Sequence, residues 1–217
     1  MQPQKGNRIS NAIAKASGAL AAILGFIALA GWIFEFPVLA SLGQEWIPMA
    51  PSSALLFVLL GTAVFFSTRV PPSRATYWLG VAIGSAGALI GLLLFFLSYL
   101  GIRLDAEHLG IAIAGLVGDS PIGHISPATA LCFLLAGLSL VATLTSYPDR
   151  HGQAMAGFWL AGLMVFANIV FLLAYLFGTP LLYGGKFIPP ALPTTLALAA
   201  LGAALLALAG PRAWAPG

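Results

Sequence analysis

Six long apolar runs, separated by short polar breaks, constrain the fold of this chain more than any other feature of its sequence. They cover residues 17–34, 51–68, 77–100, 127–146, 155–177 and 191–209. A helix of about 20 mostly apolar residues crosses the hydrocarbon core of a bilayer, where the backbone must pair its own amides. Only 7% of the 217 residues are charged, whereas soluble domains contain about 25%. The sequence therefore predicts an all-α integral membrane protein with six transmembrane helices.

The lysines and arginines predict how these helices are oriented. If residues 1–16 lie in the cytoplasm, the cytoplasmic segments hold seven basic residues and one acidic residue. The outer segments then hold two basic and five acidic residues. Because an excess of Lys and Arg marks the cytoplasmic side, we expect residues 1–16 and residues 210–217 to be cytoplasmic. The basic leader before Ala28–Ala30 imitates a secretory signal, but the apolar run continues beyond that point.

A short motif starts three of the apolar runs. Pro51, Pro127 and Pro193 are each followed two residues later by Ser or Thr, and then by a long apolar stretch. Proline suits the first turn of a helix because its missing N–H has no partner there, and Ser53, Thr129 and Thr195 can satisfy free amides of that turn. Because the prolines lie 76 and 66 residues apart, each interval contains two helices.

This spacing predicts one membrane domain, residues 17–209, built as three tandem helical hairpins: residues 17–68, 77–146 and 155–209. The third copy departs from the pattern, because Gly202 follows its proline one residue sooner than the corresponding glycines do. The alternative interpretation is that any helix that begins at the outer face of a membrane has such a start.

Small residues form stripes on two of the predicted helices. In the third run the stripe contains Gly80, Gly84, Gly87 and Gly91, and in the first run it contains Gly18, Ala22 and Gly25. Small residues let helix backbones approach closely in lipid, where no hydrophobic effect drives their association. The stripes are therefore expected to pack within the chain or to form the seam of a homodimer.

The sequence carries no recognisable catalytic motif. It has no phosphate loop, zinc-ligand spacing, Cys-x-x-Cys or nucleophile elbow, so we expect no enzyme activity, cofactor, metal site or nucleic-acid partner. Asn168 is the most polar residue in an apolar run, and Tyr175 lies seven residues later on the same helical face. Asn168 is expected either to make a hydrogen bond between helices or to contact a ligand.

The long connection before Pro127 holds most of the remaining polarity. It contains Asp105, Glu107, His108, Asp119 and His124. Carboxylates and imidazoles together can hold a divalent cation or a cationic ligand, but a solvated loop has the same composition. The residues we expect to contact a ligand are Asp119, His124, Asn168 and Tyr175.

Several stretches resemble a known class of membrane region. They are "GWIFEFPVLASLGQEWIPMAPSSALLFVLLG", "HISPATALCFLLAG", "YLFGTPLLYGGKFIPPALPTTLALAALG" and the final "AGPRAW". Together, from Gly31 to Trp214, they resemble the N-terminal membrane region of bacterial sensory histidine kinases and diguanylate cyclases, often with PAS domains. The resemblance implies a bacterial inner-membrane location and a cytoplasmic signalling module after the last helix, fused to the chain or associated with it.

Two functions are therefore expected to compete. The first is a sensory input or anchoring module of a two-component or related signalling protein, without catalytic activity of its own. The second is a small transporter or channel, for which charged or paired polar residues near the middle of the membrane would be typical. The sequence ends without a phosphoacceptor or cyclase signature, so it is either a fragment or a free-standing relative.

Overall fold

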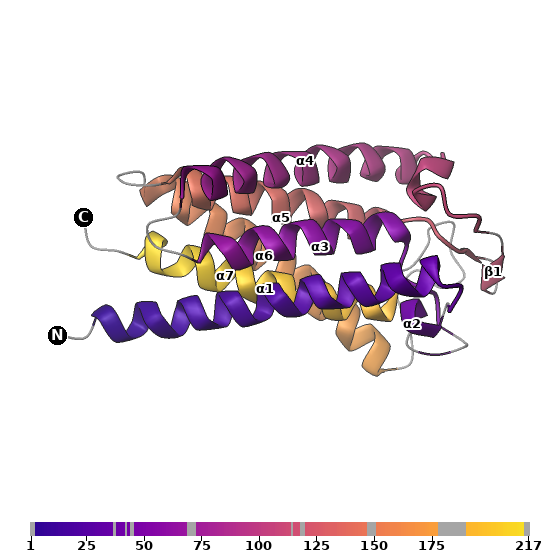
Figure 1. Cartoon of the computed structure of the whole chain (residues 1–217), viewed down its shortest axis with the longest axis horizontal. Helices are drawn as coiled ribbons and strands as arrows, with labels where there is room; N and C mark the ends of the chain where they lie inside the picture. The colour runs from indigo at the N-terminus through magenta and orange to yellow at the C-terminus, as the bar shows by residue number, and fades with distance from the viewer. Residues whose placement is uncertain are drawn as a thin grey trace.

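Six long helices form the body of the protein (Figure 1). The computed structural model describes residues 3–36, 38–41, 43, 46–68, 73–113, 115–117, 120–146, 151–177 and 190–214. The long helices are α1 (Pro3–Ile33), α3 (Pro51–Ser67), α4 (Arg74–Tyr99), α5 (Pro127–Thr145), α6 (His151–Leu176) and α7 (Leu192–Ala213). The start of α1 and the end of α7 lie at the same end of the bundle.

Short elements gather at the opposite end of the bundle (Figure 1). They are helix α2 (Val38–Ser41), the 3₁₀ helix η1 (Asp105–His108) and the strands β1 (Leu116–Val117) and β2 (Ser120–Pro121). The two strands form an antiparallel pair in which Leu116 faces Pro121. Ile111, Ile113 and Ile122 pack against the buried core, so this apolar connection folds onto the end of the bundle.

Five of the long helices, all except α3, are long and apolar enough to cross a membrane. The chain is therefore a multi-pass, all-α membrane protein, as its composition predicts. Helix α3 is equally apolar but has only 17 residues. Helix α1 begins at Pro3 rather than near residue 17, because the Gln, Lys, Arg and Ala residues of the predicted N-terminal segment favour helix.

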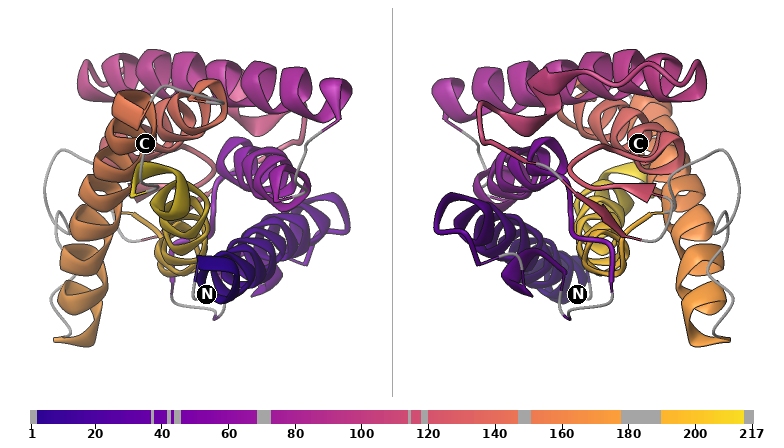
Figure 2. Two further views of the ribbon diagram at one scale, coloured as in Figure 1. Left: turned by 90° about the vertical axis from the view of Figure 1, so that its left-hand side faces the viewer. Right: turned by 90° about the vertical axis from the view of Figure 1, so that its right-hand side faces the viewer.

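The long helices pack in consecutive pairs: α1 with α3, α4 with α5, and α6 with α7. The first helix of each pair also contacts the second helix of another pair, so that α1 packs on α7, α6 on α5 and α4 on α3. The second helices, α3, α5 and α7, contact one another. Seen along the bundle, α1, α4 and α6 surround these three inner helices (Figure 2). The three pairs thus repeat around a common centre.

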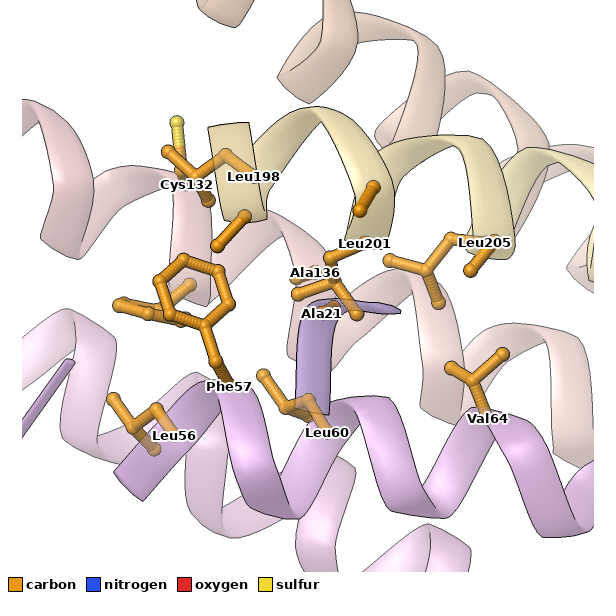
Figure 3. Packing of buried hydrophobic residues seen from close by; sticks show 14 of the residues in the cluster. Ala21, Leu56, Phe57, Leu60, Val64, Cys132, Ala136, Leu198, Leu201 and Leu205 are labelled. Carbon is orange, nitrogen blue, oxygen red and sulfur yellow. The ribbon is translucent and has the colours of Figure 1, made fainter. Parts of the chain in front are cut away.

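The core is built from equivalent positions of the three inner helices (Figure 3). Counted from the first residue of each helix, the same three offsets carry fully buried side chains, at most 1% exposed. They are Phe57, Leu60 and Val64 in α3, Phe133, Ala136 and Leu140 in α5, and Leu198, Leu201 and Leu205 in α7. The rings of Phe57 and Phe133 are 4.8 Å apart at their centroids. Apolar side chains from all three repeats therefore fill the centre.

The structure corrects the alignment of the third repeat. Helix α7 begins at Leu192, so its counterpart of Pro51 and Pro127 is Leu192, and Pro193 occupies the second helical position. The amides of the first helical positions have no partner within the helix, so proline is tolerated at either place. With this start Gly202 has the same offset as Gly61 and Gly137, and the third copy is not shortened.

The stripes of small residues pack within the chain. A Cβ atom added to Gly18 would lie 3.0 Å from the Gly61 carbonyl oxygen of α3. A Cβ atom added to Gly91 would lie 2.6 Å from the Leu134 amide nitrogen of α5. The expectation of packing within the chain is therefore confirmed for both stripes.

Candidate functional site

The starts of the three inner helices lie at the end of the bundle that carries η1 and the strands (Figure 1). The residues that precede them, Ala50, Ser126 and Ala191, all have extended backbones, with ψ values of 144°, 149° and 147°. The sequence motif therefore brings three similar helix starts together at one end.

Each of these starts is held by the outer helix of its own pair. The Trp32 Nε1–H donates to the Met49 carbonyl at 2.8 Å, and the Ser98 hydroxyl donates to the Ile125 carbonyl at 3.2 Å. The Tyr175 hydroxyl donates in the same way to the Pro190 carbonyl. All three acceptors lie one residue before the helix cap, so three different side chains perform one structural role.

A small hollow opens where the three starts meet. Its volume is about 210 Å³, including the space open to solvent, and it has room for about one water molecule. Each repeat contributes the cap residue and the third helical residue to its wall. The lining residues are Ile47, Pro48, Ala50, Ser53, His124, Ile125, Ser126, Thr129, Pro190, Ala191 and Thr194.

The three helix starts differ in how their free amides are satisfied. In α5 the Ser126 hydroxyl oxygen accepts from the Thr129 amide at 3.0 Å, which caps the helix. In α3 and α7 the cap residue is alanine and makes no side-chain hydrogen bond. The hydroxyls of Ser53 and Thr194, each side chain being only 2% exposed, line the hollow without a hydrogen-bond partner among the described residues.

These hydroxyls revise the expected role of the motif. Ser53 does not cap its helix but faces the hollow. The counterpart of Ser53 and Thr129 in the third repeat is Thr194, whereas Thr195 donates its hydroxyl to the Leu192 carbonyl at 2.7 Å. The shift follows from the helix start at Leu192, which could not be predicted from the position of Pro193.

Glu107 supports the wall of the hollow from η1. Its side chain is only 6% exposed, and its Oε2 accepts from the Ile125 amide at 2.7 Å. Its Oε1 lies 3.2 Å from Nδ1 of His124, which itself lines the hollow. The sequence placed Glu107 only in a polar loop, and nothing near it in the sequence signals burial, since Leu104 and Leu109 are themselves exposed.

A second histidine packs beside His124. The ring centroids of His108 and His124 are 4.7 Å apart, and the His108 Nε2 atom is buried with no partner among the described residues. Burial lowers the pKa of His108 and repulsion from His124 lowers it further, against the opposing effect of Asp105 and Glu107. Gly123 permits this approach, because it has φ of 87° and an added Cβ atom would lie 2.8 Å from His108 Nε2.

The four residues expected to contact a ligand have different positions. His124 lines the hollow, and Tyr175 holds Pro190, which also lines it. Asn168 lies deeper, 1% exposed, and its Nδ2 donates to the Thr195 carbonyl at 3.0 Å, which is the expected hydrogen bond between helices. Asp119 falls outside the described residues.

The described residues contain no group of three or more His, Cys, Asp and Glu side chains that could hold a metal ion. The free thiol of Cys132 is buried within α5. Comparison with known proteins found no matching family model, no matching curated protein and no matching solved structure. Function must therefore be inferred from the geometry of this chain.

Proposed function

We propose that this chain is the membrane-embedded sensory input or anchoring module of a bacterial signalling protein, without catalytic activity of its own. In this proposal six helices cross the inner membrane as three tandem hairpins, with both termini in the cytoplasm. Helix α3 serves as the sixth span, because 17 residues of helix extend about 25 Å, near the lower limit for crossing a bilayer.

The observation that carries the proposal is the hollow lined by all three repeats at one end of a filled bundle. A ligand in this hollow would touch the starts of α3, α5 and α7 together. Helix α7 runs from the hollow to the opposite end of the bundle, where α1 starts (Figure 1). A shift of α7 could therefore pass from the hollow to a module that follows the chain, provided that the stimulus favours one bundle state over another.

The apolar interior favours this function over a transporter or channel. Within α3, α5 and α7 the only charged residue is Arg212, in the last turn of α7, and the central positions carry buried apolar side chains. One observation favours the transporter: Oδ1 of Asn168 is buried and has no partner among the described residues. The resemblance to membrane regions of histidine kinases and diguanylate cyclases supports the sensory function.

A fusion of the full chain to a cytoplasmic kinase reporter tests the proposal. We expect kinase output to change in His124→Ala and Asp119→Ala, and to keep its normal level in Ser52→Ala, a buried position outside the hollow. Output that is the same in all variants and in a fusion with an unrelated six-helix anchor would reduce the role to anchoring. Movement of a solute by the purified chain in liposomes would instead support the transporter, with Asn168→Leu as the informative variant.

A further inference from the structure

The uncapped starts of α3 and α7 present hydrogen-bond donors to the hollow. In α5 the Thr129 amide is satisfied by Ser126, but the equivalent amides of Ser53 and Thr194 have no capping side chain. Amides of the first turn also have no partner within their helix. The carbonyls of the caps Ala50 and Ala191 accept from the amides of Ala54 and Thr195, so they are already used.

The two unpartnered hydroxyls point to the same chemistry. Ser53 and Thr194 are each 2% exposed, line the hollow and have no hydrogen-bond partner among the described residues. Because both hydroxyls face the hollow, each of them can donate to a ligand there that accepts hydrogen bonds. Each helix start also carries about half a positive charge from the aligned peptide dipoles.

The size and charges around the hollow restrict the ligand further. There is room for about one water molecule, which suits a compact group rather than a large organic molecule. The Glu107 carboxylate does not line the hollow, but it accepts from the Ile125 amide and lies 3.2 Å from Nδ1 of His124, both of which belong to residues that do. Its negative charge disfavours a dianion such as phosphate. A single negative charge remains compatible, because the starts of α3 and α7 carry no acidic side chain in their first turns.

We propose that the hollow binds a compact monovalent anion, either a halide ion or the carboxylate of a small acid, through the amides and hydroxyls of Ser53 and Thr194. Backbone amides at helix starts are a common anion-binding arrangement, and here two uncapped starts face one hollow. Binding by the purified chain does not depend on the proposed function; only its consequence for signalling does.

The experiment uses the full chain in nanodiscs of neutral lipid. Thermal unfolding is followed while sodium chloride or sodium formate replaces sodium gluconate at constant ionic strength. A ligand that binds only the folded chain raises Tm with its concentration. We expect Tm to rise and then saturate as chloride, formate or both are added, and not to rise in gluconate, which is too bulky for the hollow. A rise in chloride alone identifies the ligand as a halide ion, and a rise in formate alone identifies it as a carboxylate.

Variants of the two hydroxyl residues localise the site. Ser53→Ala and Thr194→Val should each weaken binding about tenfold, as expected for the loss of one charge-assisted hydrogen bond. Ser52→Ala is the matched control, because its buried hydroxyl lies one residue away but does not line the hollow. Ala191→Ser should weaken binding in another way, by giving α7 the cap that Ser126 gives α5. It should also raise Tm in gluconate, which shows that the variant folds.

The outcomes separate this proposal from the proposed function. Equal Tm in all three salts, or an anion effect that survives Ser53→Ala, Thr194→Val and Ala191→Ser unchanged, overturns the anion site. Anion binding that is lost in these variants supports it, whatever the kinase fusion does. If the purified chain binds the anion but the kinase fusion ignores both anion and variants, the sensory function fails and the site stands.

Discussion

The first two hairpins and the third hairpin solve the same packing problem differently. In α1 and α4, Gly25 and Gly91 face the backbones of their partner helices, where an added Cβ atom would lie 2.5 Å from the Ala54 carbonyl oxygen and 2.8 Å from the Ala130 carbonyl oxygen. The equivalent residue of α6 is Asn168, whose Nδ2 donates to the equivalent carbonyl, that of Thr195. A side-chain amide thus replaces direct contact between backbones.

This difference indicates which part of the bundle is easiest to move. Two helices in backbone contact through glycine cannot slide without steric clash, whereas a hydrogen bond from a side chain can break and form again. Double-mutant measurements of such bonds in membrane proteins average about 0.6 kcal/mol. We therefore infer that α6 and α7 form the more adjustable hairpin. It is also the hairpin that leads to Arg212 and the end of the described chain.

The largest loss of stability is expected when asparagine, which the third hairpin has at position 168, replaces the equivalent Gly91 of the second hairpin. Gly91→Asn puts a Cβ atom 2.6 Å from the Leu134 amide nitrogen, so α4 and α5 must separate. We expect the free energy of unfolding to fall by about 3 kcal/mol or more, at the upper end of overpacking effects. Gly162→Ala is the control, because an added Cβ atom there meets nothing within 4 Å. A Tm for Gly91→Asn equal to that of the control would contradict the close contact.

A smaller effect is expected from Glu107, whose support of a helix start has no counterpart in the other repeats among the residues that the structure describes. Glu107→Leu leaves the buried Ile125 amide without its acceptor and removes the partner of His124. We expect a loss of about 2 kcal/mol in the free energy of unfolding, because an unsatisfied buried donor costs 1–3 kcal/mol. Glu107→Gln should recover about half of this loss, since its amide oxygen can still accept from Ile125. Thermal unfolding at neutral pH measures both variants, and equal stability of wild type and Glu107→Leu would show that the carboxylate supports nothing.

The reverse substitution, glycine for Asn168 in the third hairpin, should lower the free energy of unfolding less. Asn168→Gly removes the hydrogen bond to the Thr195 carbonyl but lets α6 approach α7 as α1 approaches α3. We expect a loss of about 1 kcal/mol, well below that of Gly91→Asn. The comparison needs both variants unfolded under the same conditions. If Asn168→Gly and Gly91→Asn lower the free energy of unfolding equally, the contact of α6 with α7 does not differ from that of α4 with α5 in the way described.

The smallest effect is the change of stability with pH that His108 causes. The pKa of His108 is lowered in the folded chain, chiefly by burial, so folding favours its neutral form. The unfolded chain then binds more protons than the folded chain near the ordinary histidine pKa of about 6.5. This contribution to stability is complete above that value and is lost as the pH falls toward the lower folded pKa. Thermal unfolding from pH 7.5 to 5 should show a slope that is smaller in His108→Gln; an unchanged slope contradicts the assignment.

Much of this fold could be predicted from the sequence, because apolar runs and their breaks directly reflect the solvent of a membrane helix. The stripe of Gly84 and Gly91 could likewise be interpreted, since small residues at helical spacing have few other uses in lipid. The start of the third inner helix could not be predicted from the sequence, because proline fits the second helical position as well as the first. The burial of Glu107 could not either, since it depends on the contact of η1 with α3, which no local pattern encodes.

Three hairpins can repeat across the membrane only if α3, the shortest of the long helices, crosses it. Reporter fusions at Gly43 and at Arg74, on either side of α3, test this crossing most directly. We expect the Gly43 fusion to read as outside the cytoplasm and the Arg74 fusion as cytoplasmic, so that α3 is a sixth crossing. Fusions that report the same side at both positions would mean that α3 does not cross, and the three-hairpin arrangement in the membrane would be wrong.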